Sequence, residues 1–308
     1  RPSWTAPSPS LRGAIGASDG PPNRSPTRRW CRISDIVKQR IITALLLLPV
    51  FLPALFYPSI EPFAALSLLM IVAAGWEWAR LNGCGSSAAL LLGVGLGVLL
   101  GGVWFAGGLD WSLRPLWLTL GVLWVVLALV MLRRGVAGWG RWPAGLRLCV
   151  GLVMIAGAWL AMVQARQIGL GFLLSVLCLV WMADIAAYFG GKSFGKRKLA
   201  PNISPGKSRE GAVSGLLGVL LLAAGWLIVD PQGGSLYARL WASSPVWAVL
   251  RVVFLVAMSV AGDLVESLVK RSAGAKDSSQ LLPGHGGVLD RVDALLPVLP
   301  LAMMLITI

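Results

Sequence analysis

The sequence predicts an all-α polytopic integral membrane protein with about nine transmembrane helices. Of its 308 residues, 56% are apolar and only 13% are charged, and the mean hydropathy is +0.76. Soluble domains are about one quarter charged, and a bilayer is crossed by about 20 apolar residues. The net charge of +14 comes from basic residues between apolar segments, which is typical of a protein facing anionic lipid or phosphate rather than nucleic acid.

The first 36 residues differ in composition from the rest of the chain. They are rich in Pro, Ser, Gly and Arg and have no apolar periodicity, so residues 1–36 are predicted to be a disordered tail or a non-native leader. Residues 37–40 lead directly into apolar sequence. We therefore expect the folded protein to begin near Val37.

Windows of about 19 residues identify nine apolar segments. The first two are expected to form a hairpin, because Pro58 and Pro62 interrupt one long apolar run. The last is the shortest, at about 15 residues, below the usual length of a span. The expected spans are 41–60, 62–79, 86–108, 115–132, 145–165, 168–189, 212–229, 245–265 and 294–308.

The charges between these spans alternate from loop to loop. Basic residues gather at Arg80, at 133–147, at 192–209 and at 270–291, all in the same set of alternate loops as the N-terminus. By the positive-inside rule these loops are cytoplasmic, with the N-terminus in the cytoplasm and the C-terminus outside. The agreement of every loop supports the count of nine.

Acidic residues are concentrated late in the chain, where eight of the 13 lie between Asp184 and Asp293. Asp184 and Asp263 fall inside predicted spans, where an ionisable side chain usually faces the interior and serves a site. The alternative is a structural ion pair with a nearby Lys or Arg. Asp263, Glu266 and Lys270 are spaced to share one face of a helix.

A glycine-rich segment precedes the last two acids. Residues 283–287 read Pro-Gly-His-Gly-Gly, in which the glycines permit a tight turn or a close approach to a ligand. Asp290 and Asp293 would share a face if the last span begins there. Carboxylates from two acidic segments, completed by phosphate oxygens, suit Mg²⁺. His285 is either an acid or base, or a turn residue.

The basic loop at 192–208 contains a second candidate site. Lys207, Ser204 and Ser208 precede the span that begins near Gly211, and lysine, serine and backbone N–H groups at a helix start predict a polyphosphate cradle. The loop is not a Walker A motif, because Pro201 stands where that motif needs glycine. A solvated cytoplasmic loop is the alternative.

Three segments together resemble the signature of the phosphatidate cytidylyltransferase family, membrane enzymes that make CDP-diacylglycerol. They are Ser-Leu-Val-Lys-Arg at 267–271, Lys-Asp at 276–277, and Pro-Gly-His-Gly-Gly-Val-Leu-Asp-Arg-Val-Asp at 283–293. Supporting similarities lie at Asp184 with 188–190, and at 204–211, 76–79 and 38–44. The resemblance extends over about residues 37–308 and is densest after residue 180.

This resemblance implies that N-terminal transmembrane helices, within residues 37–180, precede a catalytic region at 181–308 with its active site on the cytoplasmic side. The implied reaction joins CTP to phosphatidic acid and releases pyrophosphate. The lipid phosphate is itself the nucleophile, so the chief difficulty is to bring two polyanions together. The implied cofactor is Mg²⁺, accompanied in this family by a monovalent cation such as K⁺.

The expected site residues fall into three groups. Asp263 and Asp290 are the leading metal ligands, with Asp184 and Asp293 as further ligands or orienting groups. Besides Asp263 and Asp290, the expected catalytic groups are Lys270, Arg271 and Lys276. The expected substrate contacts are Lys207, Ser204, Ser208, His285 and Arg291, with Arg291 expected to hold an acid in place.

The expected partners are CTP, phosphatidic acid and membrane lipids, with a homodimer as a candidate assembly and the bacterial inner membrane as the location. Two other functions remain open. A CTP-dependent lipid kinase would transfer the γ-phosphate, whereas an ion-coupled transporter would use Asp184 and Asp263 to carry protons or ions. The motif of CDP-alcohol phosphotransferases, a third membrane family, does not occur.

Overall fold

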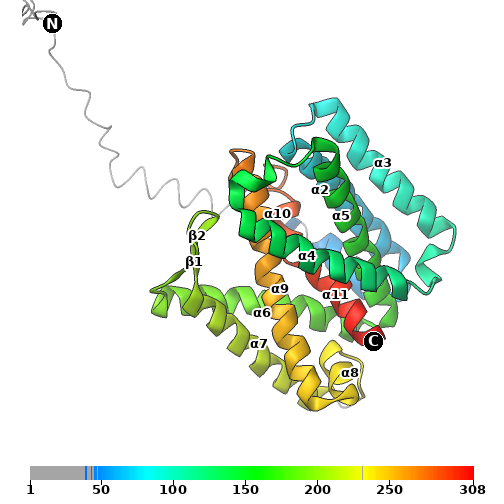
Figure 1. The fold of residues 1–308 in the computed structure, drawn as a ribbon. Coiled ribbons are helices and arrows are strands. Elements are labelled where there is room, and N and C mark those ends of the chain that lie inside the picture. Colours follow the sequence, from blue (N-terminus) through cyan, green and yellow to red (C-terminus); the bar gives the residue numbers. More distant parts are fainter. Residues whose placement is uncertain (1–38, 40–42, 44, 47, 231) are drawn as a thin grey trace, which may run out of the picture.

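A computed structural model of the chain describes residues 39, 43, 45–46, 48–230 and 232–308 (Figure 1). Seven of its helices are long and apolar enough to cross a membrane. The described part therefore has the predicted architecture of an all-α polytopic membrane protein. The seven helices are α2 (Glu61–Leu81), α3 (Ser86–Phe105), α4 (Arg114–Trp139), α5 (Ala144–Ile168), α6 (Leu170–Phe194), α7 (Arg209–Val229) and α9 (Pro245–Ser272).

The two remaining predicted spans differ from these seven. Part of the first lies outside the described residues. Residues 48–56 are helical, and this helix ends before α2 begins, as Pro58 and Pro62 predict. The last forms α11 (Leu295–Thr307), whose 13 residues extend about 20 Å, less than the bilayer core of about 30 Å. The count of nine thus stays a prediction.

Helix ends follow local sequence signals. Pro62, Pro115 and Pro245 lie in the first turns of α2, α4 and α9, where their missing N–H costs nothing. The Ser208 side chain accepts a hydrogen bond from the Gly211 N–H and caps α7. In the same way Ser235 caps the short helix α8 (Leu236–Ser243).

The loops fall into two groups, one at each end of the bundle. At one end the Trp78 indole donates to the Arg147 carbonyl, which brings the end of α2 to the start of α5. At the other end Arg166 donates to the Leu55 carbonyl, and Arg114 donates to the Thr307 carbonyl. These are the same two groups that the alternating charges predict.

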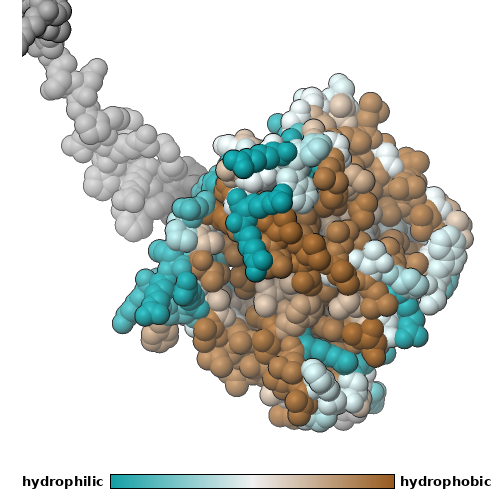
Figure 2. Space-filling model, in the orientation of Figure 1, coloured by the Kyte–Doolittle hydropathy of each residue, from teal (hydrophilic) through white to brown (hydrophobic). Residues whose placement is uncertain are grey.

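The outer surface of the bundle is apolar. Figure 2 shows hydrophobic side chains over most of the visible face, with hydrophilic ones gathered toward the hairpin and the helix ends. Leu91 and Val98 of α3 are among the exposed large side chains, at 72% and 70%. Such a surface is expected to face lipid rather than water.

One segment has strand rather than helix or loop structure. The basic loop forms an antiparallel hairpin of β1 (Lys198–Ala200) and β2 (Ser204–Ser208), in which Lys198 pairs with Ser208 and Ala200 with Ser204. The prediction of a phosphate cradle formed at a helix start alone is therefore corrected: Ser204 and Lys207 lie on a strand that leads into α7. The hairpin projects from the helices in Figure 1.

Small residues bring α6 and α7 together beneath this hairpin. A Cβ at Gly215 of α7 would lie 2.7 Å from the Ala183 carbonyl oxygen, and one at Gly211 would lie 2.8 Å from that of Ala187. These separations are too short for any side chain other than hydrogen. Because Ala183 precedes Asp184, this contact fixes the position of Asp184 relative to β2.

Candidate active site

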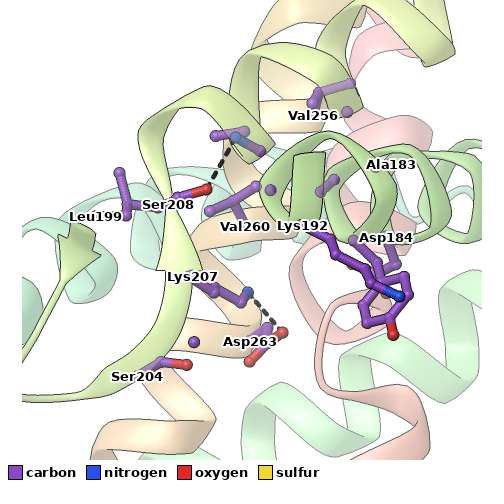
Figure 3. A pocket seen from close by; sticks show the side chains of 17 residues that line it. Ala183, Asp184, Lys192, Leu199, Ser204, Lys207, Ser208, Val256, Val260 and Asp263 are labelled. Atoms are coloured by element: carbon purple, nitrogen blue, oxygen red, sulfur yellow. Dashed lines mark hydrogen bonds and ion pairs between the residues drawn. The ribbon is translucent and has the colours of Figure 1, made fainter. Parts of the chain in front are cut away.

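A pocket of about 470 Å³ lies between α6, the hairpin, α7 and α9. Figure 3 shows Lys207 of β2 directed at Asp263 of α9. Apolar side chains of α6 and α9 line the remaining wall, among them Val256 and Val260. The polar residues that line it are Asp184, Lys192, Ser204, Lys207, Ser208 and Asp263.

The Lys207 ammonium and the Asp263 carboxylate form an ion pair of 2.5 Å. Their side chains are 25% and 26% exposed, so a ligand in the pocket can reach both of them. Asp184 lies within electrostatic range of both groups. The structure thus brings together three residues predicted from distant parts of the sequence.

The two predicted serines have different surroundings. The Ser208 side chain is buried and is engaged in capping α7. Ser204 lines the pocket at the start of β2. Ser204 can therefore contact a ligand without breaking a helix cap, whereas Ser208 cannot.

Lys270 links α9 to α10 in the C-terminal region. Its ammonium pairs with Glu266 on the same face of α9, as the spacing predicts, and lies 2.6 Å from Asp290 Oδ1. Asp290 belongs to the short helix α10 (Leu289–Val292). The Lys270 side chain is 12% exposed, and paired carboxylates offset the cost of burying its charge.

Asp290 accepts hydrogen bonds from its own loop as well. The Ser278 and Gly287 N–H groups donate to Oδ2 at 2.9 and 2.8 Å, and the Ser278 hydroxyl donates at 3.0 Å. Burial by itself raises the pKa of the Asp290 carboxyl, but the bonds from Lys270 and Gly287 outweigh this and leave the pKa below its ordinary value. The carboxylate is thereby held ionised.

Asp293 lies within electrostatic range of Asp263. Glycine at position 262 permits this, since a Cβ there would be 2.8 Å from the Asp293 carbonyl oxygen. Burial, reinforced by the negative charge of Asp263, raises the pKa of Asp293 to about 7. Asp293 follows α10 and precedes α11, so it does not share one continuous last helix with Asp290.

The glycine-rich segment forms a tight turn. The Leu282 N–H donates to the Gly286 carbonyl, and the His285 N–H donates to the Leu282 carbonyl, each at 2.8 Å. Gly284 and Gly286 have φ of +74° and +83°, values that favour glycine. His285 is therefore a turn residue in this structure, and no bond of its side chain Nδ1 is found in the described part.

Three of the predicted cations lie away from the first pocket. Lys276 lines a second pocket of about 580 Å³ together with Arg80 from the end of α2. Arg271 donates to the Ala275 carbonyl at the end of α9. Arg291 is exposed, and among the described residues it forms no ion pair with an acid.

One acid at the site was not identified from the sequence. Glu77 of α2 is completely buried and accepts bonds from the loop that carries the predicted signature, through Val288 and Leu289. Its place inside an apolar span is the same signal that singled out Asp184 and Asp263. That signal could have identified it.

Comparison with known proteins assigns the chain to a family. Residues 38–308 match the model of the cytidylyltransferase family. The chain belongs to this family. A phosphatidate cytidylyltransferase of Pseudomonas aeruginosa is 41% identical over 273 residues, which cover 86% of this chain and 95% of the relative.

Two further cytidylyltransferases are similar to this one. The phosphatidate cytidylyltransferase of Brucella suis is 34% identical, over 84% of this chain and 89% of its own. That of Haemophilus influenzae is 50% identical, over 43% of this chain and 44% of its own. The resemblance drawn from the signature residues is therefore confirmed at the level of the family.

Proposed function

We propose that this cytidylyltransferase acts on phosphatidic acid and CTP, forming CDP-diacylglycerol and pyrophosphate. Its relatives of that name support the substrate assignment. The observation that carries the proposal in the structure is the Lys207–Asp263 pair, which places a cation and a carboxylate in a pocket walled by membrane-spanning helices. A lipid phosphate can enter such a pocket while its acyl chains stay in the bilayer.

The reaction requires neutralisation and alignment more than acid–base chemistry. An oxygen of the lipid phosphate attacks the α-phosphorus of CTP, and the bond to the β-phosphate oxygen breaks as pyrophosphate leaves. Lys207 contacts one of the two phosphates and offsets their mutual repulsion. Ser204 donates to a phosphate oxygen from the neighbouring position on β2. Lys270 keeps Asp290 in place.

The carboxylates fit Mg²⁺ in type and number. Mg²⁺ commonly takes only one or two protein carboxylates and completes its shell with water and substrate phosphates. Asp263 and Asp184 line the pocket, with Asp293 next to Asp263. Among the described residues no group of three His, Cys, Asp or Glu side chains is placed to hold a metal ion, so substrate phosphates and water would have to supply the other ligands. When bound, Mg²⁺ would stabilise the charge that develops on the phosphates.

Asp290 remains a proposed ligand, although Lys270 and the N–H groups of its loop now occupy it. The monovalent cation and the homodimer also remain predictions. The protein is a membrane protein by its helices, and its bacterial relatives support the bacterial plasma membrane as its location. The N-terminus is proposed to lie in the cytoplasm.

The test is the reaction of purified protein with phosphatidic acid, Mg²⁺ and CTP labelled at either the α- or the γ-phosphorus. A cytidylyltransferase moves the α-label into lipid and releases the γ-label in pyrophosphate. Transfer of the γ-label to lipid would identify a kinase instead. Absence of any labelled lipid, combined with ion flux without CTP, would favour a transporter.

A further inference from the structure

We propose that Glu77 is a positioning residue for Asp290, acting through the hydroxyl of Ser278. The inference rests on the proposed function insofar as Asp290 serves catalysis. It starts from a geometric fact: the Ser278 hydroxyl lies 3.0 Å from Glu77 Oε2 and 3.0 Å from Asp290 Oδ2. A serine hydroxyl has one hydrogen, so Ser278 shares that hydrogen between the two carboxylates or donates it to one of them at a time. In either case its side chain lies between an acid of α2 and an acid of α10.

Glu77 uses both of its oxygens on the same loop. Oε1 accepts from the Ser279 hydroxyl at 2.6 Å and from the Val288 N–H at 2.9 Å. Oε2 accepts from the Leu289 N–H at 2.7 Å and shares the Ser278 hydroxyl hydrogen with Asp290. The carboxylate therefore ties together both ends of the loop that surrounds Asp290.

Burial of the Glu77 carboxylate is unfavourable unless hydrogen-bond donors surround it. Glu77 is fully buried, and among the described residues no Lys or Arg lies within ion-pair distance of it. Glu77 has three donors that it does not share with Asp290: the Ser279 hydroxyl and the Val288 and Leu289 N–H groups. Glycine at 287 leaves the necessary room, because a Cβ there would lie 2.0 Å from Ser278 Oγ and 2.5 Å from Glu77 Oε1.

The consequence reaches Lys270. The loop bonds to Asp290 Oδ2 orient the carboxylate so that Oδ1 faces Lys270. Glu77 contacts the loop but not Lys270, and so it acts on the site through Asp290. An apolar helix at the N-terminal end of the chain thereby sets the orientation of a carboxylate near its C-terminus.

Three substitutions separate positioning from simple stabilisation. Glu77→Gln places an amide N–H₂ against donors, and Ser278→Ala removes the shared hydroxyl. Ser279→Ala is the matched control, since its hydroxyl contacts Glu77 but not Asp290. We expect Glu77→Gln and Ser278→Ala each to lower kcat by about tenfold to a hundredfold, the effect of a small misplacement. Ser279→Ala should lower kcat less than Ser278→Ala does, because it removes a bond to Glu77 but leaves the Ser278 hydroxyl between the two acids.

The double variant Glu77→Gln/Ser278→Ala tests the route. If Glu77 and Ser278 act through the same bridge, the kcat of the double variant equals the lower of the two single-variant kcat values. Multiplied losses would overturn the proposal, as would wild-type kcat in Ser278→Ala. Should Glu77→Gln fail to insert, the comparison of Ser278→Ala with Ser279→Ala decides alone, and equal kcat in those two would overturn it.

Hydrogen exchange at single amides gives a readout independent of activity. In Glu77→Gln we expect faster exchange of the Gly287 amide, which donates to Asp290 and not to Glu77. Faster exchange only at Val288 and Leu289 would show that Glu77 holds the loop without holding Asp290, and would overturn the proposal. Because exchange needs no substrate, it decides the matter even if wild-type protein forms no CDP-diacylglycerol, a result that would refute the proposed function instead.

Discussion

At the scale of single residues, two lysines organise the site by forming ion pairs with different carboxylates. Lys207 neutralises Asp263 at the pocket, and Lys270 neutralises Asp290 and Glu266 deeper in the C-terminal region. Asp263, Glu266 and Asp290 thus each form an ion pair with a lysine. A phosphate that draws Lys207 away would expose Asp263, which is the order of events expected if substrate completes a Mg²⁺ site.

Asp263→Asn is predicted to abolish turnover, because Asp263 is proposed as a metal ligand and loss of such a ligand costs more than about 100-fold in activity. Asp290→Asn should also lose activity and in addition lower the unfolding temperature, since it leaves Lys270 with one partner fewer. Initial rates and thermal unfolding measure both effects. Asp110→Asn, at the opposite end of the bundle, is the control. Near-normal rates in both site variants would remove the metal assignment.

Lys207→Ala is predicted to weaken CTP binding by about tenfold or more, the worth of one charge-assisted hydrogen bond. The apparent KM for CTP measures this. Lys196→Ala is the matched control, because Lys196 belongs to the same basic loop but is exposed and does not line the pocket. If the two variants behave alike, the loop acts only as a topological signal.

At the scale of elements, the contact between α6 and α7 positions the hairpin over Asp184. Gly215 faces the Ala183 carbonyl at a separation that leaves no space for a methyl group, and a backbone oxygen cannot move away as a flexible side chain can. The close approach of these helices is thus a requirement of the site as well as of packing.

Gly215→Ala is predicted to destabilise the protein by about 1–3 kcal/mol, the usual cost of overpacking, and to lower activity because Asp184 moves with α6. Gly225→Ala is its control on the same helix, since a Cβ there meets nothing within 4 Å. Thermal unfolding in detergent and initial rates measure the two variants. Equal stability in both would show that the α6–α7 contact adapts freely.

At the scale of the whole molecule, the loops joined by hydrogen bonds at one end of the bundle belong to the same set of alternate loops that the charges predict. α11 is too short to span the membrane alone, yet Thr307 at its end reaches Arg114 at the end opposite the signature loop. The segment before it, which carries Asp290 and Asp293, therefore covers the rest of the distance between the two ends of the bundle.

Labelling of single cysteines in a background without Cys31, Cys84, Cys149 and Cys178 tests the orientation. We expect Gln232→Cys to react in intact cells with a membrane-impermeant maleimide, and Ala273→Cys to react only after permeabilisation. The two positions flank α9, so they lie on opposite sides if α9 spans the membrane. The reversed pattern would contradict a cytoplasmic N-terminus, and labelling of both from one side would contradict the span.

The sequence by itself determined the fold class, the seven long spans, the two groups of loops and the residues gathered around Asp263. These depend on apolar length, on charge between apolar segments and on residue type, all of which are local properties of a chain. Only the tertiary structure decided the hairpin, the short last helix, the division of the acids between Lys207 and Lys270, and the link from Glu77 to Asp290. Those depend on where α2, α6 and α9 approach one another. The spacing of residues along one helix does not reveal which residue of another helix will contact them.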